Sequence, residues 1–109
     1  MTHTTRRLLA LLACVALLPL GCKTSVREGP HEGIASIWRD YLEMAPERAL
    51  AIAGNPDRHW LAAASGGHAS RDEAEEAVLI ECRARRAVRR MQAECRLYAT
   101  GSEIVWKRR

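Results

Sequence analysis

The pattern of apolar positions after residue 31 predicts two helices. Apolar residues recur every three or four positions from 34 to 45, and Pro46 follows them. This spacing is typical of a helix with one buried face. Residues 71–93 repeat the period over a longer stretch, and Ser70 with Glu73 forms a capping box at its start. The expected apolar face of this longer helix, with Cys82 at its margin, comprises Ala74, Ala77, Val78, Ile80, Ala84, Ala87, Val88 and Met91.

Four short apolar segments predict strands that pair as two hairpins. Residues 48–53 and 58–65 flank a cluster of turn-forming residues at 54–57. Residues 95–100 and 103–107 flank the dipeptide Gly-Ser. The expected fold is therefore a small α+β domain over residues 32–109, in the order α-β-β-α-β-β, with two hairpins packed on one long helix.

The first 21 residues have the pattern of a cleavable export signal. Arg6 and Arg7 precede an uncharged run that ends at Cys22. The run is shorter than the roughly 20 apolar residues that a membrane-spanning helix needs, and Pro19 interrupts it. We therefore expect a signal peptide over residues 1–21 and a mature chain of 88 residues.

The end of this signal resembles the bacterial lipoprotein box, in which a small residue precedes a cysteine that is acylated and becomes the new N-terminus. The matching residues are 18–22, although Pro19 stands where the box usually has an aliphatic residue. The resemblance implies palmitate-type acyl chains on Cys22, which anchor a protein stably when more than one is present. It also implies a bacterial envelope, with Lys23 favouring the periplasm-facing side of the outer membrane. Cleavage without lipidation, which would give a soluble periplasmic protein, is the alternative.

The four cysteines divide between these roles. Cys14 leaves with the signal and Cys22 takes the lipid, so Cys82 and Cys95 remain. In an oxidising periplasm two remaining cysteines of a small domain favour a disulfide. This bond would join the middle of the long helix to the start of the third strand. Between the lipid and the domain, residues 22–31 are polar and broken by Gly-Pro, as in a tether.

Several segments together resemble a family of small proteobacterial envelope domains of unknown function. That family has an A-F-A-like strand, an S-x-G-x-A-S entry to a helix, a helix cysteine, a C-x-L-Y-A strand and a final V-V-W strand. The corresponding segments here are 49–53, 65–70, Cys82, 95–99 and 104–106. Leu50 replaces the usual aromatic residue of the first strand. The resemblance covers about residues 46–107 and implies a fold, but no activity.

The long helix carries acidic residues in its first half and arginines in its second half. This order complements the helix dipole, and Glu81 with Arg85 forms an i,i+4 pair, so a stabilising role is the simplest interpretation. The alternative is a surface that binds anionic lipid or cell-wall groups. Its candidate side chains are Arg83, Arg85, Arg86, Arg89, Arg90 and Arg96. Export excludes nucleic acid as a partner, and losing Arg6 and Arg7 lowers the formal net charge from +4 to +2.

The sequence contains little that indicates catalysis or metal binding. Ser65 and His68 lie close together before the long helix, but no third group that would orient the histidine is implied. His59 and His68 do not share metal-ligand spacing with the cysteines, so we expect no metal and no cofactor. We expect the five aromatic residues to be core or half-buried residues; an exposed pair would instead favour a sugar-binding platform. They are Trp38, Trp60, Trp106, Tyr41 and Tyr98.

These observations together predict a non-enzymatic lipoprotein that binds or scaffolds in the cell envelope. Its partners would be the membrane, through the anchor, and an envelope protein or an anionic cell-wall or lipid group. One alternative is a dedicated binder of anionic polymers through the arginine-rich helix end. Another is a small hydrolase that uses Ser65 and His68, and a third is an inhibitor of lysozyme-like enzymes.

Overall fold

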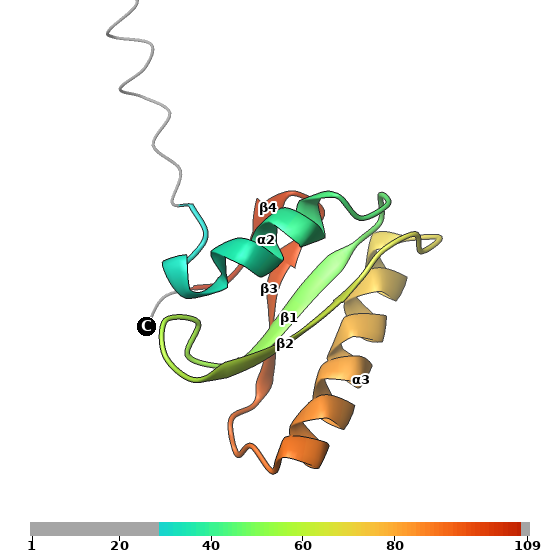
Figure 1. The fold of residues 1–109 in the computed structure, drawn as a ribbon. Helices are drawn as coiled ribbons and strands as arrows, with labels where there is room; N and C mark the ends of the chain where they lie inside the picture. The colour runs from blue at the N-terminus through green and yellow to red at the C-terminus, as the bar shows by residue number, and fades with distance from the viewer. Residues whose placement is uncertain (1–28, 108–109) are drawn as a thin grey trace, which may run out of the picture.

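A four-stranded antiparallel sheet lies between two helices in the computed structural model, which describes residues 29–107 (Figure 1). The elements in chain order are η1 (Glu32–Ile34), α2 (Ala35–Leu42), β1 (Ala49–Gly54), β2 (Trp60–Ser65), α3 (Arg71–Arg89), β3 (Cys95–Thr100) and β4 (Glu103–Ile104). This confirms the predicted α+β domain and its order of elements. The predicted signal, Cys22 and the tether up to residue 28 lie outside the described residues.

The sheet has the strand order β2-β1-β3-β4, so β1 lies in the centre. Both predicted hairpins form, β1 with β2 and β3 with β4. They are joined by antiparallel pairing of β1 with β3, in which Ile52 lies opposite Arg96. A register shift between Leu50 and Ala51 interrupts this pairing.

Strand β1 is buried on both of its faces. Ala49, Ala51 and Ala53 pack with α3, whereas Leu50 and Ile52 pack with the residues under α2. Successive side chains of a strand point to opposite faces, so small residues line one face and large residues the other. The alanines explain the close approach of α3, although alanine is a poor strand former. Both hairpins contact α3, as predicted, and α2 covers the opposite face of the sheet.

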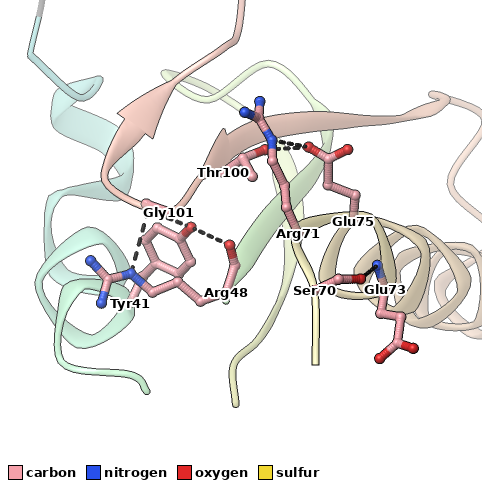
Figure 2. A network of polar contacts seen from close by, with 8 residues as sticks. All are labelled: Tyr41, Arg48, Ser70, Arg71, Glu73, Glu75, Thr100 and Gly101. Carbon is pink, nitrogen blue, oxygen red and sulfur yellow. Dashed lines mark hydrogen bonds and ion pairs between the residues drawn. The ribbon is translucent and has the colours of Figure 1, made fainter. Parts of the chain in front are cut away.

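Four of the predicted elements are longer than the observed ones, and β2 begins at Trp60 rather than at residue 58. Helix α2 ends at Leu42 rather than near Pro46, and β4 ends at Ile104 rather than at residue 107. Helix α3 ends at Arg89 because Arg90 adopts a left-handed conformation with φ 54°, and its N–H bonds back to the last turn. The start of α3 is as predicted: the Ser70 hydroxyl accepts a hydrogen bond from the Glu73 amide at 3.2 Å (Figure 2).

The buried stripe of α3 is narrower than its apolar residues suggest. Ala74, Val78 and Cys82 are fully buried, so Cys82 lies within the stripe and not at its margin. Ile80 and Val88 are 58% and 84% exposed, respectively. Cys82 forms the predicted disulfide with Cys95, the first residue of β3. The bond therefore attaches the middle of α3 to the sheet.

Polar contacts attach both helices to the same end of the sheet (Figure 2). The buried Tyr41 hydroxyl of α2 donates to the Gly101 carbonyl at 2.7 Å, and Arg48 Nε donates to the same carbonyl at 3.4 Å. On the α3 side, Thr100 Oγ1 donates to the Glu75 carboxylate at 2.7 Å. Gly101, in the turn between β3 and β4, is thus bonded to α2, and the preceding residue, Thr100, is bonded to α3.

The position of Tyr41 makes the stability of the domain sensitive to alkaline pH. Burial raises the pKa of Tyr41 above its ordinary value of 10.0, while nearby Arg48 lowers it in part. Because the folded pKa lies above the unfolded one, protonated Tyr41 contributes stability that is lost as pH rises through the folded pKa. We expect the free energy of unfolding to fall above about pH 10, and to fall less in Tyr41→Phe. Urea denaturation between about pH 8 and pH 11 measures this, and equal pH slopes for the two proteins would contradict it.

Candidate functional site

An aromatic cluster fills the space between α2 and the sheet, with Tyr98 of β3 at its centre. The fully buried Tyr98 ring lies 6.2 Å from the Trp38 ring and 5.7 Å from the Trp106 ring, measured between centroids. The Tyr98 hydroxyl accepts a hydrogen bond from the His31 backbone amide at 2.9 Å and contacts His31 Nδ1 at 2.7 Å. The folded domain therefore includes His31, which the sequence assigned to the tether.

The two tryptophans of this cluster, Trp38 and Trp106, line a cleft of about 860 Å³. Its other lining residues are Gly29, Pro30, Ser102, Glu103 and Ile104. The volume is in the range of about 300–1,000 Å³ that is usual for small-molecule sites. Both tryptophans are half-buried, whereas the two tyrosines are fully buried. The aromatic residues are therefore buried or half-buried, as predicted, and two of the half-buried tryptophans also line a cleft.

Trp106 is also contacted by an arginine that does not line the cleft. The guanidinium of Arg96 stacks on the Trp106 ring with its central carbon 3.9 Å from the ring centroid. Arg96 also donates to the Lys107 carbonyl at 3.2 Å and does not line the cleft. Such stacking is worth about 0.5–1 kcal/mol at a surface site, and it restricts the motion of both side chains.

Two polar side chains lie at the rim of the cleft. Among the described residues, none forms a hydrogen bond or ion pair with the carboxylate of Glu103, which is exposed. The hydroxyl of Ser102 accepts a hydrogen bond from Arg48 Nη2 at 2.8 Å, which leaves its own hydrogen available to donate. The cleft thus offers two aromatic rings, one strong acceptor and one donor.

The predicted arginine surface is divided by the structure. Arg85 pairs with Glu81 at 2.6 Å and donates to the Ala62 carbonyl at 2.7 Å, on the outer edge of β2. Arg86 donates to the Ala93 carbonyl at 3.0 Å. Arg96 lies across the sheet from α3, as its stacking on Trp106 shows. Within residues 29–107, the exposed arginines of α3 and its cap that have no ionic or hydrogen-bonding partner are Arg83, Arg89 and Arg90.

Ser65 and His68 meet, as the hydrolase alternative requires. Ser65 Oγ lies 2.6 Å from His68 Nε2, and the His68 amide donates to the Glu47 carbonyl at 3.2 Å. No carboxylate of the described chain hydrogen-bonds the other ring nitrogen of His68. Neither residue lines the cleft beside Trp38. The side-chain contact joins the loop before α3 to the end of β2, and the amide bond to Glu47 joins it to the loop before β1.

The described part of the chain contains no group of three or more His, Cys, Asp or Glu side chains that could hold a metal ion. Between residues 29 and 107, no helix has both the length and the apolar character to cross a bilayer. No protein-family model, curated protein or solved structure matches this chain.

Proposed function

We propose that this chain is a lipoprotein of the bacterial envelope, anchored through Cys22, whose periplasm-facing domain acts by binding and not by turnover. The observation that supports binding is the cleft between Trp38 and Trp106. Its aromatic walls rest on the buried Tyr98, and its polar groups are suited to hydrogen bonding with a ligand. The envelope location rests on the signal pattern and the lipoprotein box, and the disulfide suits an oxidising compartment.

The length of the tether limits what the cleft could reach. Gly29 and Pro30 line the cleft, so it lies where the chain enters the domain. Only residues 23–28 separate Cys22 from Gly29. A fully extended chain spans at most about 3.3–3.6 Å per residue, so the acylated cysteine and the entry of the cleft would be no more than about 25 Å apart. The ligand of an anchored domain would therefore be an envelope component close to the membrane surface.

Intact mass and lipid labelling of the wild-type chain and Cys22→Ala test the anchor. We expect an acylated, membrane-associated wild type and an unacylated variant. A cleaved but unacylated wild-type product would refute the anchor and place the protein in the soluble periplasm.

Pelleting with isolated cell-wall sacculi tests the binding role. The detergent-solubilised lipoprotein should sediment with the sacculi, and Trp38→Ala/Trp106→Ala should sediment less. Trp60→Ala is the matched control, because Trp60 is also half-buried but lies outside the cleft. Sedimentation that is absent, or equal in all three proteins, would overturn the proposed role of the cleft.

A second candidate function is supported by the three unpaired arginines of α3 and its cap. Arg83, Arg89 and Arg90 could contact phosphate or carboxylate groups of an envelope polymer. Replacing all three with glutamine should weaken salt-sensitive retention on vesicles that contain lipid A. The matched control removes three exposed cations elsewhere, at Arg39, Arg58 and Lys107. Equal retention of both triple variants would exclude a specific role for the helix end.

A further inference from the structure

We infer that the cleft between Trp38 and Trp106 binds an uncharged sugar residue of an envelope glycan; this inference rests on the proposed binding function and names its ligand class. A sugar ring has a face of C–H groups and a rim of hydroxyl groups. It is therefore complementary to a site with aromatic walls and hydrogen-bonding groups at the edge. Here the walls are two indole rings, and the edge carries Ser102 and Glu103.

Both indole rings are fixed before a ligand arrives. Trp106 contacts the Tyr98 ring, 5.7 Å away between centroids, and the Arg96 guanidinium, 3.9 Å from the Trp106 centroid. Trp38 packs against the Tyr41 ring at 5.5 Å and the Tyr98 ring at 6.2 Å. Since side chains held by packing lose little conformational entropy when a ligand binds, these rings suit a ligand recognised by ring stacking.

The charge of the residues that line the cleft disfavours an anionic ligand. Glu103 is the charged side chain that lines the cleft. A carboxylate accepts hydrogen bonds from sugar hydroxyls, and such charge-assisted bonds are stronger than neutral ones. The same carboxylate repels phosphates and uronic acids, which disfavours them as occupants. Ser102 supplies the complementary donor, because Arg48 already occupies one of the acceptor positions on its oxygen.

Calorimetric titration with chitotetraose, an uncharged oligomer of N-acetylglucosamine, tests this inference on the detergent-solubilised lipoprotein. We expect saturable binding that weakens about tenfold or more in Trp38→Ala and in Trp106→Ala. Trp60→Ala should bind as the wild type does. Tetragalacturonate, an anionic oligomer, should bind about tenfold more weakly than chitotetraose, and Glu103→Gln should reduce that difference. Formation of the disulfide and circular dichroism establish that each variant folds, and Trp38→Phe replaces Trp38→Ala if the latter does not.

The other outcomes distinguish failure of the sugar assignment from failure of the proposed binding function. If chitotetraose does not bind while sedimentation with sacculi still requires Trp38 and Trp106, the sugar assignment falls and the proposed binding function stands. If both binding and sedimentation are absent, both fall. Binding that the two tryptophan variants leave unchanged would overturn the assignment to this cleft. Equal affinity for tetragalacturonate would overturn the preference for an uncharged sugar.

Discussion

Replacing Cys82 and Cys95 together with alanine is expected to lower the free energy of unfolding by about 3 kcal/mol. The bond closes a loop with a sequence separation of 13 and so restricts the unfolded chain. A domain of this size has a total stability of roughly 4–12 kcal/mol, so the loss is a large fraction of it. Urea denaturation of the oxidised wild type and of the double variant measures the difference.

Reduction provides the control for this substitution. Adding dithiothreitol to the wild type should reproduce most of the destabilisation, because it breaks the same bond. The double variant should be insensitive to the reductant. A double variant as stable as the oxidised wild type would show that α3 stays on the sheet without the disulfide.

Replacing Tyr98 with alanine is expected to lower the free energy of unfolding by about 3–5 kcal/mol, the range for removing a large buried aromatic side chain. The Tyr98 ring is fully buried and contacts Trp38, Trp106 and His31. Its loss would remove the support that both cleft-lining tryptophans share. We therefore expect a red shift of tryptophan emission in the folded variant, together with the lower midpoint of urea denaturation.

Tyr98→Phe separates the hydroxyl from the ring. The variant keeps the aromatic packing but leaves the buried His31 amide without this acceptor. We expect this loss to lower the free energy of unfolding by about 1–3 kcal/mol. Tryptophan emission should then stay close to that of the wild type. If Tyr98→Phe is as destabilising as Tyr98→Ala, the hydroxyl rather than the ring holds this part of the core.

The local features of the fold were predictable because turns and caps are specified by nearby residues. Gly101 and Ser102 turn the second hairpin, and the capping residue Ser70 begins α3 where expected. The end of α3 was not predictable, because the left-handed residue is Arg90 and not glycine. The placement of the sheet between the two helices was also not predictable. Strand β1 is apolar on both faces, so its sequence does not show that the faces meet different helices.

The cleft was not predictable from local pattern. Trp38 lies on α2 and Trp106 follows β4, and they share a site only because both pack on Tyr98. Periodicity indicates which residues of one helix or strand share a face, but not which rings from distant segments meet. The prediction of one arginine surface failed for Arg85 for the same reason. Its hydrogen bond to Ala62 joins α3 to β2, and the pattern of one helix does not show such a contact.

That contact of Arg85 also bears on self-association. Strand β2 is an edge of the sheet, and unpaired backbone groups along an edge can template the addition of a strand from another copy. The Arg85 guanidinium, held by Glu81, donates to the outward-facing Ala62 carbonyl and so occupies a backbone group that an added strand would need. A residue that the sequence offered as a ligand-binding group thus blocks part of the edge along which a further strand could pair.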